Sequence, residues 1–94
     1  MFVGILQISF EIPDSLSIKN KRSVISSLKK RLRNTFNVSV AETDRLNNIS
    51  IGFLVIACVA SDKNYAYGII SNVVNFLEKE KRIVLMNIQT EVFP

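Results

Sequence analysis

The stretch FVGILQISFEIPDSLSIKNKRSVISSLKKRLRNT, residues 2–35, decides the fold because its hydrophobic period changes along the way. Apolar and more polar residues first alternate, which is typical of a half-buried strand over residues 2–12. Pro13 and Asp14 end this strand. One face of the strand is predicted to enter the core, and it carries Phe2, Leu6, Ile8, Phe10 and Ile12.

The second half of this stretch changes to a period of about 3.6 residues, which predicts a helix from Ser17 or Asn20 to Thr35. Its apolar residues fall within one stripe along the helix, and Phe36 continues that stripe beyond the end. The members of the stripe are Val24, Ile25, Leu28, Leu32 and Phe36.

Four further elements follow from the same periodicities. VSVAET alternates as a short strand, DRLNN (residues 44–48) indicates a turn, and an apolar strand is predicted from Ile49 to Ala60. Ser61 and Asp62 are typical of a helix start. The second helix has apolar positions at helical spacing, which are Ala66, Ile69, Ile70, Val73 and Leu77. Cations are expected to close this helix, namely Lys79, Lys81 and Arg82. A last strand is predicted over residues 83–93.

The predicted order is strand, helix, strand, strand, helix, strand, within one domain covering residues 1–94. This order indicates an α+β fold of the ferredoxin-like type, the double split βαβ (βαββαβ), with a four-stranded antiparallel sheet and two helices on one face. The third strand is apolar on both faces, so its helix-free side is expected to be covered. We therefore expect a homodimer, formed through the open sheet face or through an edge strand.

Composition argues against most kinds of active site. The chain has no histidine, which removes the commonest general base and the commonest zinc ligand, so we expect no enzyme activity, no metal and no cofactor. Glu42 and Asp44 are the only acidic pair worth considering, and a solvated turn accounts for them. The single Cys58 has no disulfide partner, and no segment looks like a membrane span or a targeting signal, so a cytoplasmic location is expected.

Charge is the most unusual feature of the chain. Residues 18–34 hold seven of the twelve basic residues and no acidic residue, and most of these cations lie opposite the apolar stripe. Such a row suits the phosphates of a nucleic acid, so ribosomal or other structured RNA is the predicted partner. The residues predicted to bind RNA phosphates are Lys19, Lys21, Arg22, Lys29, Lys30 and Arg33.

The same row of cations is compatible with two different roles. It could be a solvated helix face, or it could dock an acidic protein, which would make the chain a homodimeric interaction module without nucleic acid or catalysis. Lys19, Lys21 and Arg22 gather at the positive end of the helix dipole, so an anion should bind there or an acid such as Glu42 or Asp14 should pair with them.

Residues 15–42, SLSIKNKRSVISSLKKRLRNTFNVSVAE, resemble the YlxP-like family of small bacterial proteins, and Ser61 with Asp62 resembles a later motif of that family. Ile18 departs from the pattern, which usually has Leu there. The resemblance implies a ferredoxin-like fold and a cytoplasmic protein, and it implies no established activity. Because members are often encoded among translation and ribosome-maturation genes, it also favours ribosomal RNA as the partner.

Overall fold

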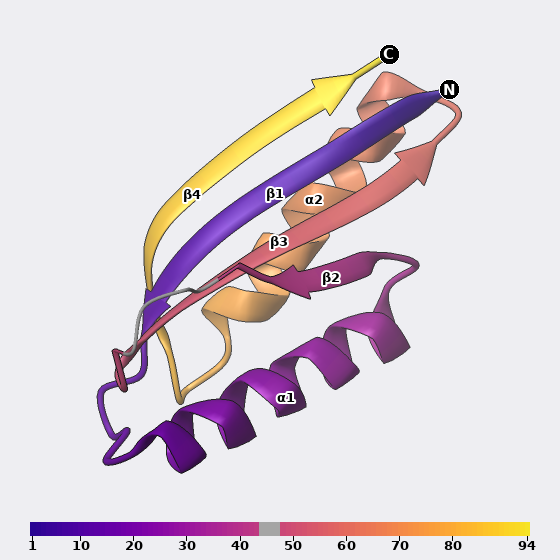
Figure 1. The fold of residues 1–94 in the computed structure, drawn as a ribbon. Coiled ribbons are helices and arrows are strands. Elements are labelled where there is room, and N and C mark those ends of the chain that lie inside the picture. The colour runs from indigo at the N-terminus through magenta and orange to yellow at the C-terminus, as the bar shows by residue number, and fades with distance from the viewer. Residues whose placement is uncertain (44–47) are drawn as a thin grey trace.

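The computed structural model describes residues 1–43 and 48–94 and contains the six predicted elements in the predicted order (Figure 1). Most of the predicted turn DRLNN, including Asp44, lies outside the described residues. The elements are β1 (Phe2–Glu11), α1 (Ile18–Thr35), β2 (Ser39–Glu42), β3 (Ile51–Ala60), α2 (Lys63–Glu78) and β4 (Val84–Phe93).

The four strands form one antiparallel sheet in the order β2-β3-β1-β4. In the middle of the sheet, Ile8 of β1 lies between Leu54 of β3 and Ile88 of β4. The register between β1 and β4 shifts at Ser9 and Phe10, as in a β-bulge. This topology confirms the predicted ferredoxin-like α+β fold.

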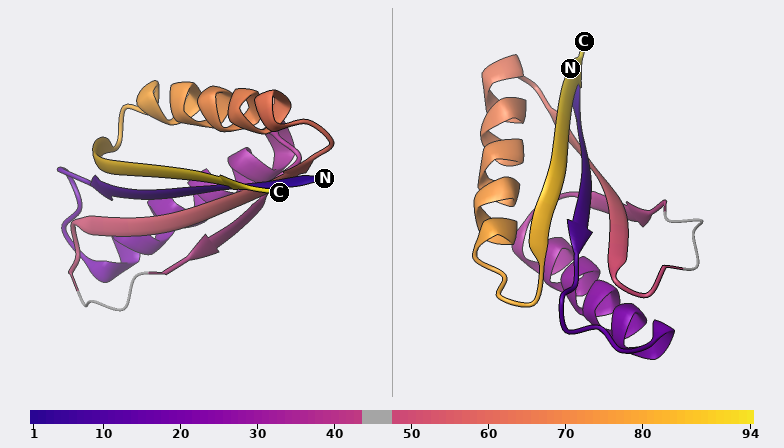
Figure 2. Two further views of the ribbon diagram at one scale, coloured as in Figure 1. Left: turned by 90° about the horizontal axis from the view of Figure 1, so that it is seen from above. Right: turned by 90° about the vertical axis from the view of Figure 1, so that its left-hand side faces the viewer.

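Both helices pack on the same face of the sheet, as contacts around two glycines show. Gly4 and its partner Cys58 lie against Ile70 of α2, and Gly52 with its partner Phe10 lies against Ile25 of α1. Figure 2 shows α2 along one side of the twisted sheet, and Figure 1 shows α1 beside β2. The opposite face of the sheet is left without a helix.

The core is made by the predicted faces of these elements. Alternate residues of β1 from Leu6 to Ile12 are buried, as are Ile25, Leu28 and Leu32 of α1. The predicted apolar positions of α2 are buried as well, apart from Ile69, which is half-buried. Cys58 is a buried free thiol.

The two helices begin as predicted, but α2 ends differently. The Ser17 hydroxyl accepts a hydrogen bond from the Asn20 amide, and the Asp62 carboxylate accepts one from the Asn64 amide. Of the cations predicted to close α2, Lys79 is the C-cap residue, whereas Lys81 and Arg82 lie beyond the helix, whose last turn has no basic residue. The chain turns at Lys79, since the Glu80 amide bonds the Leu77 carbonyl.

Candidate nucleic-acid interface

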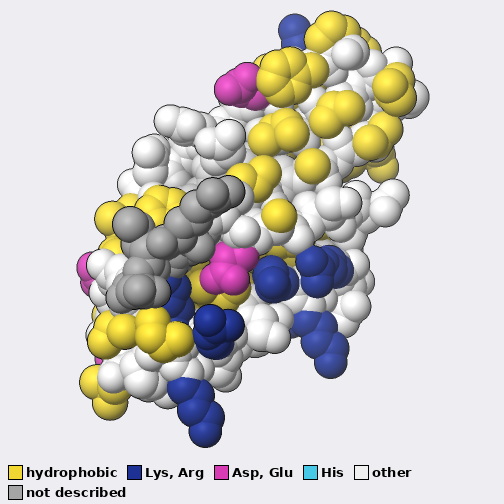
Figure 3. Space-filling view, viewed as in Figure 1, with side chains coloured by type: hydrophobic (Ala, Val, Ile, Leu, Met, Phe, Trp, Pro, Cys, Tyr) yellow, Lys and Arg dark blue, Asp and Glu magenta, His cyan; other side chains and the backbone are white. Residues whose placement is uncertain are grey.

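Most of the predicted cations lie on the outer surface of α1. Lys19, Arg22, Lys30 and Arg33 are exposed and Lys29 is half-buried, because they face away from the stripe that packs on the sheet. Figure 3 shows Lys and Arg side chains gathered over the part of the molecule where α1 lies. The surface named here the α1 basic face consists of Lys19, Arg22, Lys29, Lys30 and Arg33.

Lys21 is the exception, since its side chain lies inside the protein. It is 5% exposed, and its Nζ donates a hydrogen bond of 2.7 Å to the backbone carbonyl of Asn48, just before β3. The helical period explains this position, because Lys21 comes one turn before Ile25 and falls within the apolar stripe. Lys21 therefore joins α1 to the segment that leads into β3 and is not part of the α1 basic face.

Arg33 has both an exposed surface and a structural contact. One of its Nη atoms donates a 2.7 Å hydrogen bond to the carbonyl of Val40, which ties the last turn of α1 to β2. This contact fixes the orientation of the guanidinium group, while the residue as a whole stays exposed.

Arg31 was not predicted as a binding residue, and the structure gives it a structural role. Its guanidinium forms an ion pair with Glu80 and lies 5.1 Å from the centre of the Phe76 ring, an arrangement suited to a cation–π contact. The Phe76 ring also meets Phe36 edge-to-face at 5.6 Å. Arg31 thus links α1 to the end of α2.

Glu80 is the centre of a cluster that the sequence did not predict. Arg82 donates to its carboxylate from Nε, from one Nη atom and from its backbone amide at 3.0–3.1 Å, and the same guanidinium reaches Ser27 of α1. These hydrogen bonds from Arg82, assisted by Arg31, lower the pKa of Glu80 to about 2, although burial opposes the shift. Glu80 and Arg31 are 49 positions apart, so no local pattern could have paired them.

Glu42 of β2 lies beside part of the α1 basic face. It lines a hollow of about 170 Å³ together with Arg22, Ile25, Ser26 and Lys29, so two cations and one carboxylate share this hollow. Within the described part of the chain, Glu42 forms no ion pair with Arg22. Two positive charges therefore remain beside one negative charge, and their field favours an anion.

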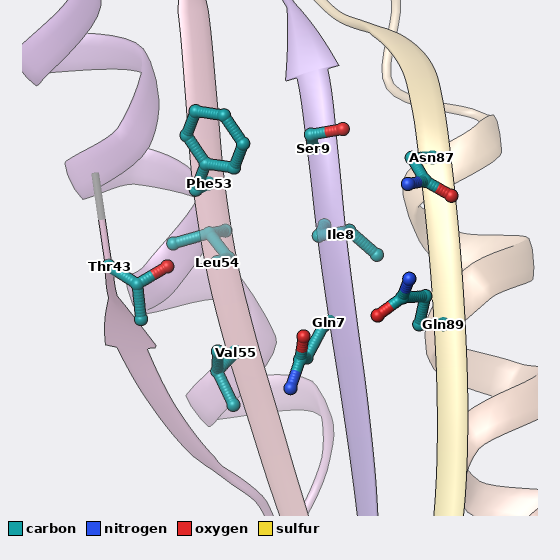
Figure 4. Close-up of a pocket in the computed structure, with 9 residues that line it drawn as sticks. All are labelled: Gln7, Ile8, Ser9, Thr43, Phe53, Leu54, Val55, Asn87 and Gln89. Atoms are coloured by element: carbon teal, nitrogen blue, oxygen red, sulfur yellow. The ribbon is translucent and has the colours of Figure 1, made fainter. Parts of the chain in front are cut away.

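A second hollow, of about 160 Å³, lies on the helix-free face of the sheet (Figure 4). Uncharged polar side chains line it together with Phe53 and Val55, and the register places Ser9 between Phe53 and Asn87 and places Gln7 between Val55 and Gln89. The polar residues are Gln7, Ser9, Thr43, Asn87 and Gln89.

Residues 1–43 and 48–94 contain no cluster of acidic and cysteine side chains suited to a metal. No three Cys, Asp or Glu side chains in these ranges lie close enough together to hold a metal ion. None of the described helices has the length and apolar character needed to cross a membrane.

Comparison with known proteins adds a family and supports the fold. A comparison with curated proteins finds no match. Among solved structures, the chain is similar to a de novo designed protein, Foldit4, with a TM-score of 0.53 and 15% sequence identity over 98% of this chain and 97% of that chain. At this identity the likeness supports the fold alone. Residues 3–90 match the family described as "Protein of unknown function (DUF503)", and the chain belongs to that family.

Proposed function

We propose that this protein binds structured RNA through the α1 basic face. The observation that carries the proposal is the charge of α1, which has seven basic residues and no acidic residue over 18 positions, with five of the cations facing outward. An 18-residue helix is about 27 Å long, enough to follow several phosphates along an RNA backbone. Each phosphate that a cation neutralises releases a counterion, and this release favours binding.

The contrast with Arg31 supports binding over a merely solvated face. Arg31 forms an ion pair with Glu80, whereas Arg22, Lys29 and Lys30 form no ion pair with any described residue. Neighbouring cations on a helix repel each other by a few tenths of a kcal/mol per pair, and this cost disappears when an anion binds. A polyanion would therefore stabilise the α1 basic face.

Structured RNA fits this surface better than single-stranded RNA. A rigid helix with long cationic side chains can contact phosphates on a folded RNA, but the α1 basic face contains no aromatic ring on which bases could stack. The resemblance to the YlxP-like family makes ribosomal RNA the first class to test. Binding of this kind should show weak sequence preference.

The test is a mobility-shift titration against structured ribosomal RNA fragments at several salt concentrations. The test variant carries Arg22→Gln, Lys29→Gln and Lys30→Gln, and the control carries Lys63→Gln, Lys79→Gln and Lys81→Gln, so both lose three charges at exposed or half-exposed sites. If the proposal holds, the affinity of the wild type and of the control falls steeply with salt. The slope of log affinity against log salt concentration should be smaller for the test variant, by an amount that corresponds to roughly three phosphate contacts. Equal weakening of both variants would mean that net charge alone drives binding.

A second candidate, docking of an acidic protein, is favoured by two apolar side chains beside the cations. Leu16 is 85% exposed and Ile18 is 38% exposed, next to Lys19 at the start of α1. Protein interfaces concentrate their binding energy in such apolar contacts, whereas phosphate binding does not need them. Leu16→Ser should therefore leave RNA affinity unchanged if RNA is the partner, and a clear loss of RNA affinity would contradict that assignment.

A further inference from the structure

The helix-free face of the sheet has an apolar half. The register of the strands places Val3 between Val59 and Phe93 in one row across the sheet, and places Ile5 between Ala57 and Glu91 in the next row. Val59 is 64% exposed and Phe93 is 47% exposed. Figure 3 shows hydrophobic side chains clustered over this end of the sheet. An exposed cluster of apolar side chains on a small protein is typical of an interaction site.

The other half of the face is polar but uncharged. Gln7 and Gln89 lie side by side in one row and Asn87 lies beside Ser9 in the next (Figure 4), and within the described residues the three amides form no hydrogen bond. A primary amide both donates and accepts hydrogen bonds, so one copy of this cluster can satisfy a second copy of the same cluster. A cluster of charges of one sign could not do so.

Charge on this face suits a second copy of the chain and argues against RNA. The protein has a net charge of +4, yet none of its twelve basic residues lies in β1, β2, β3 or β4 as the structure defines them. The charged side chains that the strands contribute to the open face are Glu11 and Glu91. A polyanion gains nothing from this surface, whereas two positively charged copies can meet here without bringing their cations together.

We infer that the helix-free face is the interface of a homodimer, in which the sheets of two copies stack face to face. Stacked sheets lie about 10 Å apart, which allows the apolar rows to interdigitate and the amide clusters to pair across the interface. Figure 3 shows the Lys and Arg side chains over α1 in the same view as this sheet face, below the strands, so in the dimer each α1 basic face lies beside the interface and stays exposed. The inference does not depend on whether those faces bind RNA.

The competing way to dimerise is edge pairing along β4. β4 has ten residues at the edge of the sheet, and two of its exposed apolar residues, Met86 and Ile88, lie away from the apolar rows described above. Ile88 is level with the buried Ile8, so its side chain points to the helix side of the sheet and not to the open face. A charge at Ile88 therefore tests the edge, and a charge at Val59 tests the face.

The experiment measures the mass of the protein by sedimentation over a concentration series. The wild type is expected to be a dimer, and Val59→Lys is expected to be a monomer throughout. Tyr65→Lys on α2 is the matched control, since Tyr65 is as exposed as Val59 at 64%, and it should remain a dimer together with Ile88→Lys. Circular dichroism confirms that each variant is folded, and Phe93→Lys replaces Val59→Lys if the latter does not fold.

Three results would overturn the inference. A wild type that stays monomeric over the whole series shows that the face is not an interface between copies. A folded Val59→Lys variant that remains a dimer shows that the copies meet elsewhere. Dissociation by Ile88→Lys but not by Val59→Lys assigns the contact to the edge of β4.

Discussion

Gly52 shows at the scale of one residue how closely α1 sits on the sheet. A Cβ atom at this position would lie 2.6 Å from two atoms of the Phe10 ring and 3.2 Å from Ile25. Phe10 and Ile25 are both buried, so neither can move aside without disturbing the core. Gly52 therefore has no side chain because a ring and a helix occupy the space.

We predict that Gly52→Ala lowers the free energy of unfolding by about 2 kcal/mol, as overpacking of a core does. Gly68 is the matched control, since nothing lies within 4 Å of its added Cβ and it is within α2. Gly68→Ala should raise stability by about 0.5–1 kcal/mol because alanine favours a helix. Urea unfolding of the two variants and the wild type gives both values, and a neutral Gly52→Ala would contradict the packing described here.

Lys21 and Arg22 are neighbours in sequence with opposite roles, and this gives a second prediction. Lys21→Ala removes a buried stem and the hydrogen bond to Asn48, so stability should fall by about 2–3 kcal/mol while the salt dependence of RNA binding stays the same. Arg22→Gln should leave stability unchanged and should reduce the salt dependence of RNA binding. Thermal unfolding and mobility-shift titration of both variants test this prediction. If Lys21→Ala reduced the salt dependence of RNA binding without lowering stability, Lys21 would belong to the binding surface.

At the scale of the elements, sequence periodicity was enough for the architecture. The buried face of β1, the buried stripe of α1 and the order of the strands all follow from periods of two and 3.6. Lys21 could have been placed correctly from the same period, because on a helical wheel it lies between Leu28 and Leu32. Its charge favoured a surface position in the prediction, although a long lysine stem packs well among apolar residues.

The contacts between elements were not predictable, because they join distant parts of the chain. Arg31 meets Glu80 only when α1 and the end of α2 have folded onto the same sheet. In the sequence, α1 has no acidic residue that could pair with its cations. In the folded protein, Glu80 pairs with Arg31. The α1 basic face consists of cations that the fold does not neutralise in this way.

The Glu80 cluster gives a pH-dependent prediction at this scale. Hydrogen bonds from Arg82 hold the pKa of Glu80 at about 2, below its ordinary 4.5, so the stabilisation is complete above pH 4.5 and is lost as pH falls towards 2. Glu80→Gln should lower stability at pH 7 by about 1 kcal/mol, a modest value because Arg31 and Arg82 are each more than a third exposed.

Chemical denaturation at pH 7, 4 and 2.5 checks this prediction. The difference between the wild type and Glu80→Gln should narrow as the pH falls. Glu78→Gln is the control, because Glu78 is an exposed carboxylate at the end of α2, two residues before Glu80. A difference that stays constant across these pH values would mean that the ionised Glu80 carboxylate contributes nothing to stability.

At the scale of the whole molecule, the open face of the sheet and the α1 basic face have different electrostatic characters. The strands that form the open face carry no basic residue, whereas the α1 basic face lies on the outer surface of α1. Two copies of a positively charged protein repel each other least where their own field is weak, and a polyanion is attracted most where that field is strong. The separation of these surfaces therefore permits both kinds of association at once.

If both proposals hold, dimerisation should strengthen binding to RNA by allowing two α1 basic faces to act on one molecule. On a long folded RNA, the wild type should bind at least about tenfold more tightly than the monomeric Val59→Lys variant, because the second contact becomes intramolecular. On an RNA too short to reach both α1 basic faces, the two proteins should bind alike, since each uses one of them. Tyr65→Lys carries the same added charge and should match the wild type on the long RNA. Val59→Lys adds a cation, so its charge alone would raise the affinity for RNA. A lower affinity of this variant for the long RNA would therefore come from the loss of the second copy of the chain.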